Sequence, residues 1–132
     1  MIKRLTLLAM LAFGFPSPTL AHEQPILGTM PPYPGATRPL PHWETANLAI
    51  ALTPDKPETV IGYYMVSMTR SGWTPAPGIG AEALAAAAAQ EPAWLTFLKP
   101  GAGRLDIQIT RGVHPGTKQP ATLVFYQSTF KP

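Results

Sequence analysis

The stretch TPDKPETVIGYYMVSMTRSGW, from Thr53 to Trp73, has the clearest helical period in the chain and constrains the fold more than any other segment. Its apolar side chains recur at the i, i+1, i+4, i+5 and i+8 positions of one helix face, namely Val60, Ile61, Tyr64, Met65 and Met68. Asp55 and Glu58 have the spacing of an N-terminal capping box, and Gly72 can take the left-handed conformation that ends a helix. The pattern predicts a long amphipathic helix from about Lys56 to Ser71.

Gly62 lies inside this predicted helix. A glycine in a helix interior costs about 1 kcal/mol relative to alanine. We therefore expect the helix to pack closely at Gly62, against the sheet.

Segments with strand character lie on both sides of the predicted helix. In ETANLAIALT, Leu48, Ile50 and Leu52 alternate with smaller residues, which is typical of a strand with one buried face. After the helix, AWLTFLK, RLDIQITRG and ATLVFYQSTF are separated by the turn PGAG and the loop VHPGTKQP. This regular spacing indicates an antiparallel meander. We expect an α+β fold, with the helix packed on a four- to five-stranded antiparallel sheet.

The alanine tract from Ala81 to Ala89 predicts a second, short helix. Alanine is the best helix former, but a helix of about ten residues is marginal alone in water. Because the tract lacks large apolar side chains, we expect it to be loosely held on the domain.

The chain begins with two cations, Lys3 and Arg4, then an apolar run to Phe15 and a small-residue site at Ala21. This order is typical of a secretory signal peptide, and the apolar run is too short to span a membrane. We expect three parts: a signal peptide over 1–21, a Pro-rich arm over 22–43 and one domain over 44–132. The protein is then periplasmic or secreted and is not embedded in a membrane.

Composition narrows the classes of function. Without Lys3 and Arg4 the chain carries eight basic and seven acidic residues, so it has no charge excess suited to nucleic acid. It has no cysteine, so a packed apolar core and not a disulfide framework must stabilise it. The acids are scattered, and no serine lies in a Gly-x-Ser-x-Gly elbow. We therefore expect a protein that is not an enzyme.

Three short motifs give a resemblance. YPGA at Tyr33, TPDKPETVIGYY from Thr53 and SGW ending at Trp73 resemble a recurrent type of small secreted or lipid-anchored bacterial domain. That type has a YPGA turn, a T-x-D-x-P-E-x-V-x-x-Y-Y helix start and a Gly-Trp helix exit before a β-meander. The resemblance implies the fold and the location, and it supplies no active site. The alanine tract departs from the type.

The histidines raise a metal hypothesis. Cleavage after Ala21 would leave His22 with a free amine beside its imidazole, and a further imidazole from His42 or His114 would complete a nitrogen set suited to Cu(II). No close His spacing predicts a zinc site. Copper is therefore the one cofactor that the sequence suggests, and a periplasmic copper-binding protein is the alternative function.

Binding is the leading interpretation. A sheet covered on one face, beside a loosely held alanine helix, can leave a groove for a small apolar ligand or an extended peptide of a protein partner in the cell envelope. Trp43, Trp94 and Tyr126 are the candidates to line it. The same side chains can instead fill the core, as large apolar residues ordinarily do.

Overall fold

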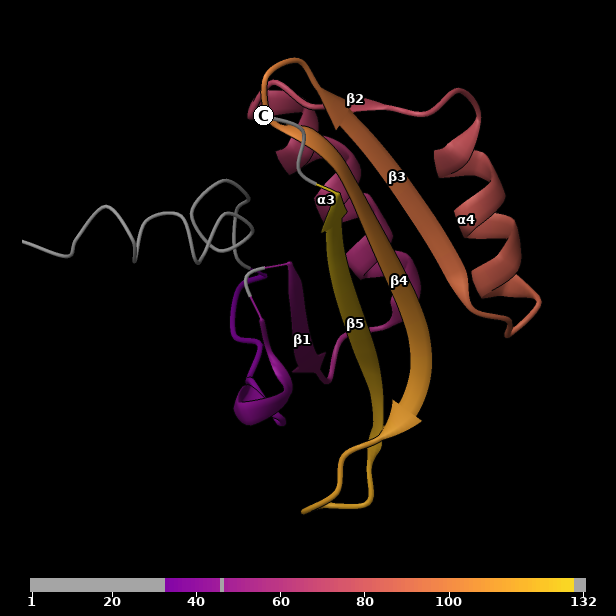
Figure 1. Cartoon of the computed structure of the whole chain (residues 1–132). Coiled ribbons are helices and arrows are strands. Elements are labelled where there is room, and N and C mark those ends of the chain that lie inside the picture. Colours follow the sequence, from indigo (N-terminus) through magenta and orange to yellow (C-terminus); the bar gives the residue numbers. More distant parts are fainter. Residues whose placement is uncertain (1–32, 46, 130–132) are drawn as a thin grey trace, which may run out of the picture.

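The computed structural model describes residues 33–45 and 47–129. The predicted signal peptide, His22 and the first part of the Pro-rich arm lie outside these residues. Five strands form one sheet (Figure 1): β1 (Leu48–Thr53), β2 (Thr74–Pro75), β3 (Ala93–Lys99), β4 (Gly103–Val113) and β5 (Pro120–Thr129). Neighbouring strands are antiparallel and follow the order β1-β5-β4-β3-β2. The predicted α+β class and the antiparallel sheet are confirmed.

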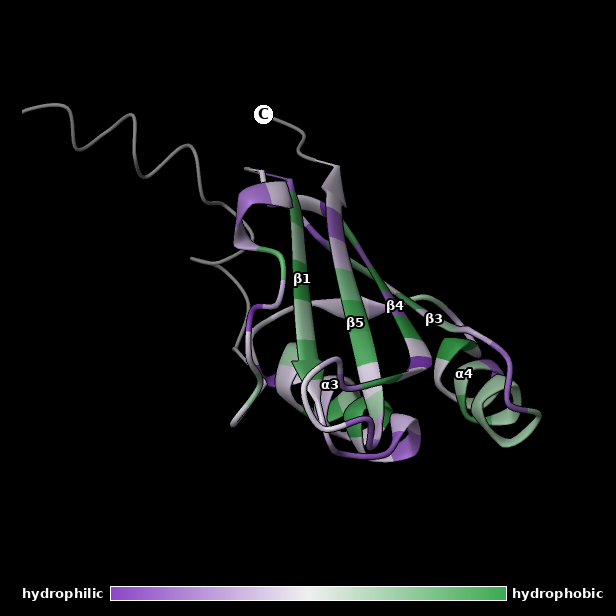
Figure 2. Cartoon of the chain, turned by 90° about the horizontal axis from the view of Figure 1, so that it is seen from below, coloured by the Kyte–Doolittle hydropathy of each residue, from purple (hydrophilic) through white to green (hydrophobic). Residues whose placement is uncertain are grey.

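Two α-helices, α3 (Pro57–Arg70) and α4 (Ile79–Ala88), lie on the same side of this sheet (Figure 2). A short 3-10 helix, η2 (Pro41–Trp43), precedes β1. The strand register places alternate residues on the helix side, where they form the core. These are Ala93, Leu95 and Phe97 of β3, Leu105, Ile107 and Ile109 of β4, and Val124 and Tyr126 of β5.

The prediction of one long helix is not confirmed. The helix α3 has 14 residues and α4 has 10, so α3 is about 21 Å long. It ends in a Schellman motif: Gly72 has φ +91, its N–H donates to the Thr69 carbonyl, and the Trp73 N–H donates to the Met68 carbonyl. The Gly-Trp exit therefore stops the helix and turns the Trp73 side chain, only 4% exposed, into the core.

The start of α3 corrects a second expectation. Lys56 is the N-cap residue and no side chain caps the helix, so the capping box predicted from Asp55 and Glu58 is wrong. The Asp55 carboxylate instead accepts a hydrogen bond from Tyr33. Pro57, at the first position, needs no hydrogen-bond acceptor.

The expected close packing at Gly62 is also wrong. Gly62 is exposed, and a Cβ built there would meet nothing within 4 Å. The close approach between the helices lies at Gly80 of α4, where a Cβ would be 2.9 Å from the Met65 Cε. Ala83 and Ala87 are both 1% exposed. Since small residues let a helix approach its neighbours closely, the alanine tract packs tightly on the domain and is not loosely held.

The outer edge of β1 is closed by the segment that precedes it. The backbones of Thr37 and Leu52 exchange two hydrogen bonds of 2.9 Å, and Thr45 pairs with Leu48. Between these two bridges the Ile50 N–H donates to the Glu44 carboxylate at 3.5 Å. The described part of the Pro-rich arm therefore covers a sheet edge that would otherwise be open to pairing.

In the part of the chain that the structure describes, neither α-helix is long and apolar enough to cross a membrane.

Candidate functional site

All four tyrosines of the chain meet in one cluster. The rings of Tyr33 and Tyr63 lie 5.0 Å apart, as do those of Tyr63 and Tyr64, and the rings of Tyr64 and Tyr126 lie 5.7 Å apart. The hydroxyl oxygens of Tyr64 and Tyr126 share a hydrogen bond of 2.7 Å. The cluster ties the YPGA turn to the helix and to the central strand β5.

Asp55 joins this cluster to the turn between β1 and α3. Its carboxylate accepts a hydrogen bond of 2.5 Å from the Tyr33 hydroxyl, and its carbonyl accepts one from the Thr122 hydroxyl. Its own N–H donates to the Thr53 hydroxyl. Asp55 therefore holds the N-terminal turn, the start of α3 and strand β5 together, which is a structural role.

Burial sets the ionisation of these phenols. It raises the pKa of Tyr126 to about 12, although the hydrogen bond from Tyr64 and the charge of Arg38 act in the opposite direction. Burial also raises the pKa of Tyr64, and burial together with the Asp55 carboxylate raises the pKa of Tyr33. The folded protein thus keeps these three phenols neutral, and they are poor general bases at ordinary pH.

The three predicted groove residues do not come together. Tyr126 is 3% exposed and belongs to the core, because its side chain points to the helix side of β5. Trp43 is 62% exposed on η2, next to the β1 edge, whereas Trp94 is 50% exposed on β3. A groove that includes Tyr126 is therefore wrong, and only Trp94 lies beside the alanine helix.

The described histidines form no metal site. His42 is exposed on η2 and packs edge-on against Trp43, at 6.2 Å between ring centroids. The His114 Nδ1 accepts hydrogen bonds from the N–H groups of Gly116 and Thr117, in the loop between β4 and β5. Residues 33–45 and 47–129 contain no group of three His, Cys, Asp or Glu side chains able to hold a metal ion. The copper hypothesis stays a prediction that rests on His22.

Most of the described acids have partners that explain them. Glu44 pairs with Arg38, and its other contact holds β1. Asp106 accepts hydrogen bonds from Thr96 and Arg104 on the outer side of the sheet. Glu58 lies 3.8 Å from Arg111.

The outer side of β3 carries two large apolar side chains. Trp94 and Leu98 lie on the face of β3 opposite to the core residues Leu95 and Phe97, and each is 50% exposed. They are four residues apart on the same face of one strand, so their Cα atoms are about 13 Å apart. Between them Thr96 donates to Asp106 at 2.7 Å. We call the row of Trp94, Thr96 and Leu98 the β3 surface.

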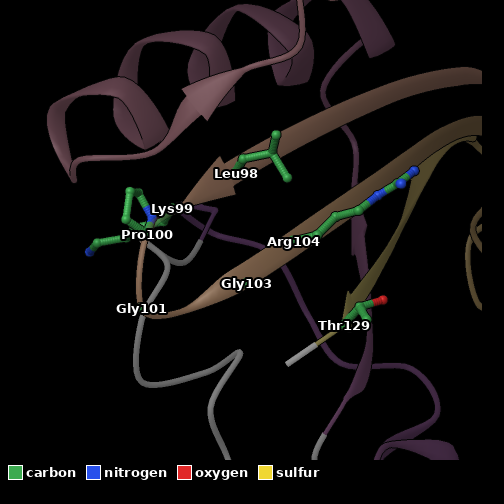
Figure 3. A pocket seen from close by; sticks show the side chains of 7 residues that line it. All are labelled: Leu98, Lys99, Pro100, Gly101, Gly103, Arg104 and Thr129. Carbon is green, nitrogen blue, oxygen red and sulfur yellow. The ribbon is translucent and has the colours of Figure 1, made fainter. Parts of the chain in front are cut away.

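Each end of the β3 surface borders a pocket. At the Leu98 end, a pocket of about 600 Å³ lies by the turn between β3 and β4 (Figure 3). Leu98, Arg104 and Thr129 form one cross-strand row along its wall. The Lys99 amino group is occupied elsewhere, since it donates to the Ser71 carbonyl and lies 5.8 Å above the Trp73 ring.

At the Trp94 end, a smaller pocket of about 210 Å³ lies between β3 and α4. The helix α4 flanks the outer edge of β3 (Figure 1), because β2 pairs only with Phe97 and Leu98. The lining side chains are Ile79, Glu82, Ala83, Ala86, Pro92 and Trp94. Small side chains on the helix leave room beside the indole.

The comparisons with protein families, with curated proteins and with solved structures give no match.

Sequence reasoning missed Leu98 as a site residue. The strand AWLTFLK is apolar on both faces, so its own alternation does not tell which side is exposed. A signal was present in the next strand, where the polar residues Asp106 and Gln108 alternate with Leu105, Ile107 and Ile109. Pairing the two strands in register puts Trp94 opposite Gln108 and Leu98 opposite Arg104, which marks both as outer residues.

Proposed function

We propose that this chain is a non-enzymatic binding domain of the periplasm or the cell exterior, and that its β3 surface binds an extended segment of a protein partner. The location rests on the signal-peptide pattern at the N-terminus. The binding role rests on the β3 surface and its two pockets. The scattered, mostly paired acids favour a binding protein over an enzyme.

One observation carries the proposal. Trp94 and Leu98 are half exposed on the same face of one strand, and each lines a different pocket. Exposed apolar groups that lie singly are ordinary, but these two lie on one row of the same strand and each borders a pocket, which supports a binding role. Tryptophan is also among the residues that contribute most to binding energy.

The dimensions favour an extended polypeptide over a compact ligand. Five residues of an extended chain cover about 13 Å, so side chains at positions i and i+4 of a partner can reach both pockets. Between the pockets, the Thr96 hydroxyl oxygen and the Asp106 carboxylate can accept hydrogen bonds from a partner backbone. A contact of this size is smaller than a standard protein interface, so we expect weak, reversible binding.

A displayed library of random decapeptides tests the proposal. Peptides enriched on the purified protein should lose at least about tenfold in affinity with Trp94→Ser or Leu98→Ser, because each variant removes a central apolar contact. Val66→Ser and Val113→Ser are matched controls, since these valines are also exposed and lie on α3 and at the far end of β4.

Equal losses in the control variants would contradict the proposal, as would enrichment of no peptide above background. Binding of the apolar dye anilinonaphthalene sulfonate at Trp94, with no peptide enriched, would instead indicate a small apolar ligand and would overturn the polypeptide partner.

A further inference from the structure

The pocket at the Trp94 end combines one aromatic ring, one carboxylate and otherwise small apolar walls. Glu82 and Trp94 lie on opposite elements, α4 and β3, and both line the pocket. Ala83, Ala86, Ile79 and Pro92 provide the rest of the lining. This combination differs from that of the other pocket, whose charged lining residues, Lys99 and Arg104, are both cations.

The Glu82 carboxylate differs from Glu58 of α3 and Asp106 of β4 in its contacts with the described residues. Asp106 and Glu58 each face an arginine, while Glu82 makes no ion pair and no side-chain hydrogen bond with the described residues. Its place in the first turn of α4 suits the positive end of the helix dipole. That interaction accounts for an acid in the first turn but not for its position beside an exposed indole.

The alanines of α4 account for the shape of the pocket. Ala83 and Ala86 both line the pocket with Trp94, and the side chain of each is a single methyl group. A larger side chain at Ala86 would occupy the space between the helix and the indole. The alanine tract therefore keeps open the pocket that Glu82 and Trp94 border.

We propose that this pocket binds a cationic side chain, lysine or arginine, of the partner segment. The proposal rests on the proposed function and names one feature of its ligand. A cation over the face of a tryptophan is attracted by the ring quadrupole, and tryptophan is the best of the aromatic residues for this contact. The Glu82 carboxylate supplies the complementary charge. The volume of about 210 Å³ accommodates the end of one such side chain.

The spacing of the two pockets, together with the cation in one of them, predicts a sequence preference for the partner segment. With the cation in the Trp94 pocket, the partner residue four positions away lies at the Leu98 pocket, whose Leu98 and Pro100 side chains are apolar. Peptides that bind the β3 surface should therefore carry lysine or arginine four residues from an apolar residue.

The test uses nuclear magnetic resonance of the full exported protein labelled with ¹⁵N. N-acetyl-lysine methylamide and N-acetyl-arginine methylamide are titrated in, and the indole N–H of Trp94 is followed. The neutral analogue is N-acetyl-norleucine methylamide, which has a similar apolar stem and no charge. We expect saturable shifts of the Trp94 signal with the two cations, weaker binding at high salt, and no saturation with norleucine.

Matched variants assign the contact. Glu82→Gln keeps the shape of the side chain and removes its charge, and it should weaken lysine binding by about fivefold. Glu91→Gln removes a nearby exposed acid that does not line the pocket and should leave binding unchanged. The two variants carry the same charge change, so a difference between them reports the pocket and not the net charge.

Norleucine binding as tight as lysine would overturn the inference, and so would equal effects of Glu82→Gln and Glu91→Gln. Tetramethylammonium binding much more tightly than the lysine derivative would overturn the side-chain ligand in favour of a small free ammonium compound. In the peptide library, loss of binding in Leu98→Ser with no effect of Glu82→Gln would reject the cation pocket and leave the β3 surface standing. Failure of every peptide would instead reject the proposed function.

Discussion

At the scale of single residues, the hydrogen bond between Tyr33 and Asp55 explains why two motifs far apart in sequence occur together. Tyr33 is buried under Tyr63 and Tyr64, and its hydroxyl reaches the Asp55 carboxylate at 2.5 Å. The tyrosine of YPGA and the aspartate of TPD thus form one contact. This contact holds the arm that closes the β1 edge.

Replacing Tyr33 by Phe should lower the free energy of unfolding by about 1 to 2 kcal/mol, since a hydrogen bond to a charged group is lost while the ring stays. Urea unfolding followed by circular dichroism measures the change. The double variant with Asp55→Ala is the control: the two losses should be far from additive, because Tyr33→Phe removes the donor and Asp55→Ala removes the acceptor of the same bond. Additive losses would contradict the contact.

Gly62 offers a second prediction at this scale. It is exposed in the middle of α3 and faces open space, so Gly62→Ala should raise the free energy of unfolding by about 0.5 to 1 kcal/mol. Thermal unfolding should show a melting temperature several degrees higher. A variant less stable than the parent would mean that a neighbour lies against Gly62.

At the scale of elements, Arg111 joins both helices to the sheet. Its guanidinium donates to the Ala87 carbonyl at the C-terminal end of α4, at 3.2 Å, and lies 3.8 Å from Glu58 in the first turn of α3. The helix dipoles favour the positive charge of Arg111 at the C-terminal end of α4 and the negative charge of Glu58 at the N-terminal end of α3. Arg104, seven residues earlier on the same strand, points to the opposite face of the sheet and pairs with Asp106.

Arg111→Met should therefore lower the free energy of unfolding by about 1 kcal/mol, because a helix C-terminus loses a charged donor. Arg104→Met is the matched control, since it breaks an exposed pair on a single strand and should cost less. Chemical denaturation of both variants measures the two changes in the free energy of unfolding. A larger cost for Arg104→Met would reverse the roles assigned to the two arginines.

At the scale of the whole molecule, the buried tyrosines make stability depend on alkaline pH. An unfolded tyrosine has a pKa of about 10, and burial raises the pKa of Tyr126 to about 12 and also raises those of Tyr33 and Tyr64. Above about pH 10 the unfolded chain releases protons that the folded protein keeps. The stabilisation is thus complete below that pH and is lost as the pH rises through the folded values.

Absorbance at 295 nm and circular dichroism, recorded together against pH, check this. We expect three phenols to ionise in the same transition in which the dichroism is lost. Tyr126→Phe should make that transition less steep by about one proton. Ionisation of all four tyrosines in a protein that keeps its folded dichroism would contradict the buried cluster.

The sequence predicted the elements better than their contacts. Local signals identified β1, β3, β4 and β5, the PGAG turn and the Gly-Trp exit, since each depends on neighbouring residues, but they did not identify the two-residue strand β2. Contacts between distant residues escaped prediction: Glu44 with the Ile50 N–H, and Tyr33 with Asp55. The same holds for the site. The alternation of residues around Trp94 places its side chain on one face of the strand, but it does not predict whether another element covers that face. Glu82 appeared only once α4 was seen to flank β3.

The closed edge of β1 also limits how copies of this protein can associate through backbone pairing. Thr37, Glu44 and Thr45 already occupy the groups that a neighbouring strand would need. At the other end of the sheet β2 is two residues long and includes Pro75, which leaves part of β3 beside α4. The Ala76 N–H donates to the Thr96 carbonyl, and α4 flanks the remainder of this edge, so among the described residues both edges of the sheet are covered or interrupted. We therefore expect the domain to resist the strand-by-strand addition of further copies that leads to fibres.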